Sequence, residues 1–347
     1  MNLFKWFLFP LSILFWLVTS IRNFFYDIGW LKSSKFDTPI IGLGNITVGG
    51  TGKTPHTAYI ASIFSTNQKV AILSKGYGRN SNEFKYVTID SDVKLVGDEP
   101  MQAKQNFPDQ IVAVDHNRVN GVLNILHDHQ DTTVIILDDA FQHRSIKIGL
   151  NILLSDYNRP LHSDFLMPIG NLREKSSAIK RADCMIITKC PENLSKQEAE
   201  TLKEKINFNG EIFFSKIIYD KLVALNESSR TIIFENIKKV VLVTAIAQNQ
   251  PIIDQLNSKD IDYQLVQFRD HYNYKKKDIF RIIELNQNIE GDSIILTTEK
   301  DAQKLKEFEE LKSQPVYYLK VSVDFLWNKD KFDKKLNDYV RGNQKYS

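Results

Sequence analysis

The fold of this 347-residue chain is decided by the stretch Thr47-Val48-Gly49-Gly50-Thr51-Gly52-Lys53-Thr54. The stretch follows an apolar run at Pro39–Leu43 and precedes an amphipathic run at Pro55–Phe64. A glycine-rich loop between a strand and a helix directs backbone N–H groups toward an anion at the helix N-terminus. With Lys53 reaching the terminal phosphates and the Thr54 hydroxyl reaching Mg²⁺, the spacing predicts a nucleotide-binding P-loop.

One position departs from the usual pattern G-x-x-x-x-G-K-[ST], because Thr47 stands where the first glycine is usual. A glycine-rich turn with an incidental lysine is the alternative interpretation. The strand before the loop and the helix after it favour the nucleotide site, since both are needed to aim such a loop at a phosphate.

Outward from this loop, apolar runs of strand length alternate with helical patterns from Thr38 onward. This alternation is typical of a parallel sheet built from βαβ units. The predicted strands are Pro39–Leu43, Val70–Leu73, Ile111–Val114, Val134–Leu137, Asn151–Leu154 and Met185–Thr188, and the predicted helices are Pro55–Phe64, Arg118–Leu126 and Ser195–Ile206. We expect a doubly wound parallel sheet of the P-loop NTPase type.

A second alternating series comes after Glu211–Tyr219, which is interpreted as an edge strand or a connector. Its predicted strands are Val240–Thr244, Tyr263–Phe268, Ser293–Thr297 and Val316–Val321, and its helices are Ile252–Leu256, Lys277–Leu285 and Asp301–Leu311. The series predicts a smaller α/β domain with its own sheet, as the length of the chain also suggests. We therefore expect three parts: an N-terminal membrane-associated helical segment at 1–36, a P-loop kinase domain at 37–220 and a smaller α/β domain at 221–347.

Composition excludes some classes of protein. The 45 basic and 42 acidic side chains give a net charge of +3, which is too slight for a nucleic-acid-binding surface. No obligatory protein partner is indicated. The cysteines Cys184 and Cys190 lie in or beside an apolar run, as reduced core thiols of a cytosolic protein do.

The N-terminus carries an apolar and aromatic run from Trp6 to Thr19. As a helix it would reach about 21 Å, against a hydrocarbon core of about 30 Å. A signal peptide, a buried helix and a segment inserted in one leaflet all fit this length. We favour the inserted segment, because no good cleavage site follows the run, whereas interfacial aromatic and basic residues do: Phe24, Phe25, Tyr26, Trp30, Arg22, Lys32 and Lys35.

Acidic residues occur where a nucleotide site needs them. Asp138 and Asp139 directly follow the predicted strand Val134–Leu137, and Mg²⁺ in such sites requires a carboxylate nearby. Phosphoryl transfer to an alcohol also needs a group that orients and deprotonates the acceptor. The segments Gly97–Pro100 and Asp270–Tyr272 supply candidates. From these residues alone, the chain is a P-loop phosphotransferase or an ATPase.

The order of the motifs resembles that of the tetraacyldisaccharide 4′-kinase family, the lipid A 4′-kinases. The resemblance covers most of the chain, and its combination of the P-loop with Gly97–Pro100 and Asp270–Tyr272 is specific. After the membrane-seeking N-terminus, the matching stretches are Gly44–Pro55, Leu73–Arg79, Gly97–Pro100, Asp138–Arg144, Pro168 with Gly170, Leu172–Glu174, Asp270–Tyr272 and Thr298–Asp301.

The resemblance implies transfer of the γ-phosphoryl group of ATP, with Mg²⁺, to the 4′-hydroxyl of a tetraacylated glucosamine disaccharide 1-phosphate. The product would be lipid IVA, formed at the cytoplasmic face of the bacterial inner membrane. By motif, Asp98 is the expected base, assisted by His271, and the expected metal ligands are Thr54, Glu99 and Asp138 or Asp139. The expected phosphate or sugar contacts are Arg79, Arg118, Gln142, Arg144 and Arg173.

Two rival interpretations stay open. A membrane-associated P-loop ATPase that acts as a conformational switch would share the loop and the acidic strand end. A nucleotide-gated scaffold would keep Lys53 and Thr54 without needing Asp98. One departure from the family pattern also bears on the second domain, because Thr244-Ala245-Ile246-Ala247 stands where glycines are expected.

Overall fold

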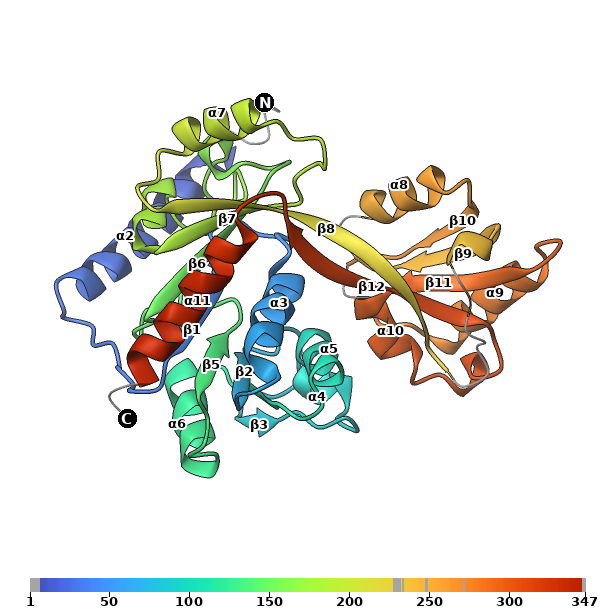
Figure 1. Ribbon diagram of the computed structural model, residues 1–347, viewed down its shortest axis with the longest axis horizontal. Coiled ribbons are helices and arrows are strands. Elements are labelled where there is room, and N and C mark those ends of the chain that lie inside the picture. Colours follow the sequence, from blue (N-terminus) through green and yellow to red (C-terminus); the bar gives the residue numbers. More distant parts are fainter. Residues whose placement is uncertain (1–6, 227–231, 233, 247–248, 271, 345–347) are drawn as a thin grey trace.

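The computed structural model describes residues 7–226, 232, 234–246, 249–270 and 272–344. Within these residues a single mixed sheet of twelve strands runs through the molecule, in the order β10-β9-β11-β12-β8-β7-β6-β1-β5-β2-β4-β3 (Figure 1). Helices pack against both faces of its first half. The predicted α/β class with a P-loop-type parallel sheet is confirmed.

The first half of the sheet is parallel except at its outer edge. Its parallel strands are β1 (Ile40–Asn45), β2 (Val70–Ser74), β4 (Ile111–Val114), β5 (Val134–Leu137), β6 (Leu150–Asp156) and β7 (Cys184–Thr188), and the short β3 (Lys85–Tyr86) is antiparallel to β4. The helices of this half are α3 (Lys53–Ser65), α4 (Val93–Val96), α5 (Asp98–Asn106), α6 (Arg118–Asp128) and α7 (Lys196–Ile206), with 3₁₀ turns at Leu161–Ser163 and Ser176–Arg181. The predicted strands all form, each within two residues of its expected ends.

Strand β1 shows why the apolar runs became buried strands. Successive side chains of a strand point to opposite faces, so a strand covered on both sides must be apolar throughout. Ile41 packs with Ile60 of α3 in one core, whereas Ile40 packs with Val122 of α6 in another. Two cores therefore meet at this strand, and the P-loop follows it.

The second half is joined to the first by a long strand, so the expectation of a separate sheet is wrong. Strand β8 (Glu211–Ala224) pairs in parallel with β7 through Phe214 and then antiparallel with β12 (Val316–Phe325) from Ser215 onward. The run interpreted as an edge strand or a connector is thus an internal strand that carries the sheet across both halves. The other elements are β9 (Lys239–Thr244), β10 (Asp262–Gln267), β11 (Ser293–Thr298), α8 (Gln250–Ser258), α9 (Lys276–Gln287), α10 (Glu299–Leu305) and 3₁₀ turns at Phe234–Asn236 and Glu309–Leu311.

Two further differences concern helices. The predicted helix Asp301–Leu311 divides into α10 and a 3₁₀ turn. The last helix, α11 (Lys329–Gln344), returns to the first half, where Phe332, Leu336 and Val340 lie in the core beneath α3. The division at 37–220 and 221–347 stays a prediction, but packing places α11 with the P-loop half.

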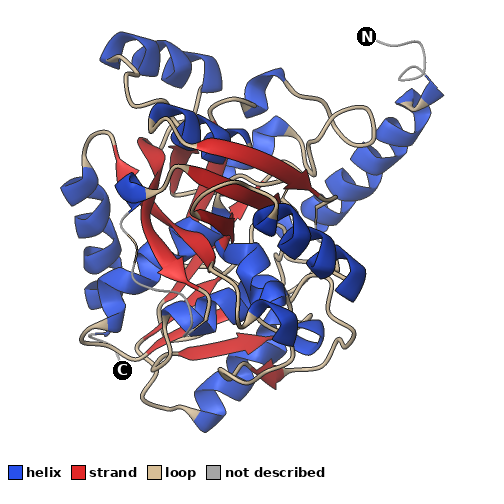
Figure 2. Cartoon of the chain, turned by 90° about the vertical axis from the view of Figure 1, so that its right-hand side faces the viewer, coloured by secondary structure: helices blue, strands red, loops and turns tan. Residues whose placement is uncertain are grey.

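Helix α2 (Phe9–Asp27) lies at the periphery and extends outward from the body near the N-terminus (Figure 2). Among the helices of the described residues it is the one long and apolar enough to cross a membrane, by length and composition, and only 6% of that window is buried. This exposure removes the buried-helix interpretation. Trp6, the start of the predicted run, lies outside the described residues.

Candidate active site

The P-loop is bent by two glycines and tied down by its neighbours. Gly49 and Gly52 have φ values of +101° and +81°, a region that favours glycine, and α3 begins directly after Gly52. The Asn45 amide donates to the Thr51 hydroxyl at 2.6 Å, and the Thr188 hydroxyl donates to the Thr51 carbonyl at 2.9 Å. Hydrogen bonds within the protein therefore hold the loop in this shape.

A buried histidine supports the start of α3 from beneath. His56 contacts the Gly52 carbonyl through Nδ1 at 2.7 Å and the Ser215 hydroxyl through Nε2 at 2.9 Å. Burial lowers the pKa of His56 to about 4, so the ring is neutral at physiological pH. Because a carbonyl only accepts, Nδ1 carries the proton and Nε2 accepts from Ser215.

Asp139 lies between the two cations of the site. Its Oδ1 is 3.7 Å from the Lys53 ammonium, and Arg173 donates to its two oxygens at 2.8 and 3.1 Å. Burial acts to raise the pKa of Asp139, but the Arg173 hydrogen bonds and the Lys53 charge hold it at about 2. Arg173 also bonds to Asn45 at the end of β1. The site thus carries a charged triad of Lys53, Asp139 and Arg173.

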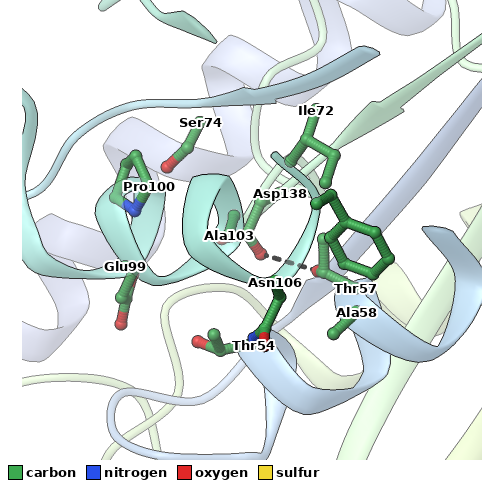
Figure 3. A pocket seen from close by; sticks show the side chains of 11 residues that line it. Thr54, Thr57, Ala58, Ile72, Ser74, Glu99, Pro100, Ala103, Asn106 and Asp138 are labelled. Atoms are coloured by element: carbon green, nitrogen blue, oxygen red, sulfur yellow. Dashed lines mark hydrogen bonds between the residues drawn. The ribbon is translucent and has the colours of Figure 1, made fainter. Parts of the chain in front are cut away.

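Asp138 has the opposite electrostatic character. It is 5% exposed, and the Thr57 hydroxyl donates to its Oδ1 at 3.2 Å. Burial raises its pKa to about 7, with a further contribution from the negative charge of Glu99. Asp138, Glu99 and Thr54 line the same pocket (Figure 3). An added cation in this pocket would favour the ionised form of both carboxylates.

These donors fit Mg²⁺ bound together with a nucleotide. Among the described residues no group of three or more His, Cys, Asp or Glu side chains forms a site for a metal held by protein alone. Mg²⁺ usually takes one or two carboxylates plus phosphate oxygens and water. The Thr54 hydroxyl with Asp138 and Glu99 is such an oxygen-donor set.

Asp98 lies next to Glu99 but faces the second half of the molecule. It begins α5, is 4% exposed, and its Oδ2 lies 3.4 Å from Lys304 and 3.9 Å from Lys300, both on α10. Lys300 is also 3.7 Å from Glu99. Sequence reasoning assigned no role to these lysines, although Lys300 lies in the matching stretch Thr298–Asp301.

The expected partner of Asp98 in the second half, His271, lies outside the described residues. Its chain neighbour Tyr272 accepts a hydrogen bond at its carbonyl from Lys304, at 3.3 Å. Lys304 thus contacts both Asp98 and the segment that carries the histidine. A second pocket bordered by Asp98 is lined by residues of both halves, among them Tyr77, Lys94, Tyr274 and Lys304.

The remaining expected contacts separate into two groups. Arg173 and Gln142 lie at the P-loop, where the Gln142 amide donates to the Asn45 carbonyl at 2.9 Å. Arg118 is 1% exposed and donates to the carbonyls of Asp115 and Asp138 at 2.6 and 2.9 Å, and its expected contact with a phosphate or sugar stays a prediction.

Arg79 and Arg144 also bond to the protein itself. Arg79 donates to the Glu83 carbonyl at 2.7 Å. Arg144 contacts α2, with its guanidinium 2.7 Å from Asp27 and 2.8 Å from the Asn23 carbonyl. Sequence motifs placed these arginines near the site but could not indicate which way each side chain points.

Three charged residues on the other side of the loop were missed. Lys189 comes after β7 and bonds to the Gly50 carbonyl and, at 2.9 Å, to Asp156 at the end of β6. Arg159 lies 3.6 Å from Asp156. Their signal in the sequence was position, because side chains at the carboxyl ends of parallel strands meet at the ligand-binding edge of the sheet.

The departure at Thr244–Ala247 is explained in part. The Ala245 amide donates to Asp301 Oδ2 at 2.9 Å, and that carboxylate also accepts from the Thr298 hydroxyl at 2.7 Å. The Ala245 amide is therefore engaged within the protein. Ala247 lies outside the described residues.

Comparison with known proteins gives a consistent result. The sequence model of the tetraacyldisaccharide-1-P 4′-kinase family matches residues 4–341. Tetraacyldisaccharide 4′-kinase of Flavobacterium johnsoniae is 40% identical over 345 residues, covering 99% of each chain, and that of Flavobacterium psychrophilum is 41% identical over 345 residues, covering 98% of each.

A solved structure agrees in fold as well. The crystal structure of LpxK from Aquifex aeolicus, described as an "apo" form in complex with ATP, has a TM-score of 0.76 and 28% identity over 97% of this chain and 99% of that one. The match covers the P-loop half, the strands β8 and β12 that join the halves, and the second half together. This chain belongs to the tetraacyldisaccharide-1-P 4′-kinase family.

Proposed function

We propose that this chain transfers the γ-phosphoryl group of ATP to the 4′-hydroxyl of a tetraacylated glucosamine disaccharide 1-phosphate, giving lipid IVA in lipid A biosynthesis. One observation carries the assignment of roles within the site. Asp98 and Glu99 are neighbours on the first turn of α5, yet they line different pockets. Glu99 lines the pocket of Thr54 and Asp138, and Asp98 lines the pocket shared with the second half. Donor and acceptor sites thus meet at two adjacent carboxylates.

The donor side rests on the P-loop. Backbone N–H groups of the loop and the N-terminus of α3 would cradle the phosphates, and Lys53 would contact the outer ones. Arg173 holds Asp139 beside Lys53, so the ammonium and the guanidinium stay close together despite their like charge. On the opposite side of the loop, Lys189 bonds to both the Gly50 carbonyl and Asp156 and so holds the loop in place.

Thr54, Glu99 and Asp138 would hold Mg²⁺, with Asp139 next to them. When bound, the ion neutralises charge on the phosphate oxygens and orients the γ-phosphoryl group for in-line transfer. The raised pKa of Asp138 means that the carboxylate has a proton to lose near neutral pH. Nucleotide binding would therefore be coupled to release of that proton.

On the acceptor side, Asp98 would orient the 4′-hydroxyl and accept its proton as the oxygen attacks phosphorus. Lys300 and Lys304 lie within 4 Å of the carboxylate and fix its direction. His271 would assist from the second half, and Lys304 joins its neighbour Tyr272 to Asp98. The remaining predicted contacts at Arg79, Arg118, Gln142 and Arg144 would support these groups.

Helix α2 would attach the enzyme to the cytoplasmic face of the bacterial inner membrane as a peripheral or monotopic protein. Its outer face exposes large apolar side chains along its length, including Phe9, Leu14, Val18, Ile21 and Phe24. Because the acceptor carries four acyl chains, it stays in the bilayer and its sugar must be reached from the interface. The partners are then the lipid disaccharide and the membrane surface.

Labelled ATP and the disaccharide 1-phosphate test this function directly. Wild-type protein should move label from the γ position into the lipid fraction, whereas Asp98→Ala should not. A membrane-bound ATPase that serves as a switch is the second candidate function. Release of labelled phosphate at a rate independent of the lipid, with none in the lipid fraction, would favour the switch.

A further inference from the structure

The segment 166–174 lies between α2 and the P-loop and bonds to both; we name it the bridging segment. On the P-loop side, the Val48 amide donates to the Asn171 carbonyl at 2.7 Å and the Arg173 amide donates to the Ile46 carbonyl at 2.6 Å. Thr47 and Leu172 form an antiparallel bridge between these two bonds. The start of the P-loop is thus bonded to the bridging segment in the pattern of a short antiparallel strand pair.

The other side of the bridging segment carries α2. Ser12 is the one fully buried residue of this helix, at 8% exposure, and its hydroxyl donates to the Leu166 carbonyl at 3.2 Å. The same hydroxyl accepts from the Ile169 amide at 3.3 Å. One turn further on, Trp16 lies under the Lys175 ammonium at 4.3 Å. Helix α2 is therefore docked by directional contacts.

Glu174 ends the bridging segment and is nearly inaccessible, with its side chain 1% exposed. Arg181 lies 2.8 Å from its Oε2, the Asn23 amide donates to the same atom at 2.8 Å, and Arg22 lies 3.8 Å from Oε1. A buried carboxylate is costly unless its oxygens are paired. Two of these three partners, Asn23 and Arg22, belong to α2.

The next residue back, Arg173, points the other way and bonds to Asp139 and Asn45. A second route joins the same two places: Arg22 donates to the Gln142 carbonyl at 3.3 Å, and the Gln142 side chain donates to the Asn45 carbonyl at 2.9 Å. Both routes end at the last residue of β1, directly before the P-loop. A shift of α2 would therefore be transmitted to the nucleotide site at two points.

From this arrangement we infer that Glu174 is a positioning residue for the nucleotide site, and that Asn23 and Arg22 of α2 complete it. The helix is then part of the phosphate-binding unit in addition to being an anchor. Glu174 acts through Arg173, which sets Asp139 and Lys53. By thermodynamic linkage, stronger docking of α2 on the bridging segment and tighter MgATP binding favour each other. The inference rests on the proposed function only in taking the P-loop as the ATP site.

The first test removes one hydrogen bond from α2 and measures MgATP affinity without any acceptor. Asn23→Ala should weaken MgATP binding about 3-fold in detergent micelles, because only part of the free energy of one hydrogen bond to a charged group would be transmitted to the nucleotide site. Its matched control is Thr19→Ala on the same helix, because the Thr19 hydroxyl bonds to the Phe15 and Trp16 carbonyls of α2 itself. Thr19→Ala should leave the affinity unchanged, and flotation with phospholipid vesicles should be unaltered in both variants.

The second test acts on the carboxylate. Glu174→Gln should weaken MgATP binding about 10-fold, the usual scale for losing a partner behind a ligand-binding residue. With acceptor in mixed micelles, the KM for MgATP should rise and the KM for the lipid should not. Wild-type affinity in both Asn23→Ala and Glu174→Gln, measured below their unfolding temperatures, would overturn the inference, as would equal weakening in Thr19→Ala. Failure of the proposed function is separate, since it would appear as unlabelled lipid with the wild-type protein.

Discussion

The two halves of the sheet differ in the residues at the ends of their strands. In the P-loop half, β1, β5 and β7 lead into the phosphate loop, the pair Asp138–Asp139 and Lys189, which gather at one edge. In the second half, the Ala245 amide after β9 is bonded to Asp301, which also accepts from Thr298 at the end of β11. In the first half the charged side chains face a pocket. In the second half the Asp301 carboxylate instead bonds to Ala245 and to Thr298 at the start of α10. The two halves share an α/β architecture, but the strand ends form a binding site in the first half and stabilise a helix start in the second.

The second half contributes to the site through α10. Lys300 and Lys304 reach across to Asp98 and Glu99 of the first half. Acceptor chemistry is therefore expected to depend on both halves, and nucleotide chemistry mainly on the first half, which the second half reaches through Lys300 at Glu99. Substitutions in each half can separate these two dependences.

Loss of the P-loop lysine should have the largest effect. Lys53→Ala removes the cation that faces Asp139 and the terminal phosphates, so kcat/KM for label transfer should fall by about 1,000-fold. Lys69→Ala is a suitable control, since Lys69 pairs with the exposed Asp131 at 3.8 Å. Near-normal transfer by Lys53→Ala would remove the P-loop half from the chemistry.

The candidate base should come next. Asp98→Asn should lower kcat by about 100-fold or more while leaving MgATP affinity nearly intact, because Asp98 lines the acceptor pocket. Single-turnover transfer and nucleotide binding are measured on the same protein, with Asp131→Asn as the control. A parallel loss of MgATP binding would move Asp98 to the donor side and break the comparison.

The contribution of the second half should be smaller. Lys304→Ala removes the cation 3.4 Å from Asp98 and the hydrogen bond to the Tyr272 carbonyl, so kcat/KM for the acceptor should fall about 10-fold with MgATP affinity unchanged. Lys312→Ala, at an exposed pair with Glu309, is the matched control. If the two variants behave alike, α10 has no part in acceptor chemistry.

The smallest effect concerns pH and the stability of the ligand-free protein. The folded-state pKa of Asp138, at about 7, lies above its ordinary value of 3.8. The folded state therefore binds this proton more tightly, and the contribution of Asp138 to stability is lost as pH rises from about 4 through 7. Asp138→Asn should raise the melting temperature relative to wild type at pH 8 and leave little difference at pH 4.

Two histidines act in the opposite direction and provide the contrast. Burial lowers the pKa of His56 and of His143 to about 4. The contribution of each histidine to the stability of the folded protein is therefore lost as the pH falls from about 6.5 toward 4. The wild-type profile sums these trends, and the difference between wild type and Asp138→Asn isolates the carboxylate. A pH-independent difference would show that Asp138 does not titrate in this window.

The sequence was informative where a signal is local. The alternation of apolar runs placed the strands of both halves, and the P-loop and the Asp138–Asp139 pair stood after such runs, whereas Asp98 was assigned as the base only through the family motif. It was less informative for contacts between distant segments. The pairing of Lys304 with Asp98, the long course of β8 and the contact of Arg144 with α2 each depend on how the elements pack. Periodicity within one element carries no record of its neighbour in space.

The return of α11 has a consequence for synthesis of the chain. Phe332, at the start of this helix, packs against Phe213 with ring centroids 5.0 Å apart, so a segment translated after the whole second half shares the core of the first helix of the nucleotide site. The P-loop half must wait, with an apolar surface uncovered, until the second half and α11 have been synthesised. A premature stop shortly before Lys329 would therefore harm the amino-terminal half more than the half that immediately precedes the stop.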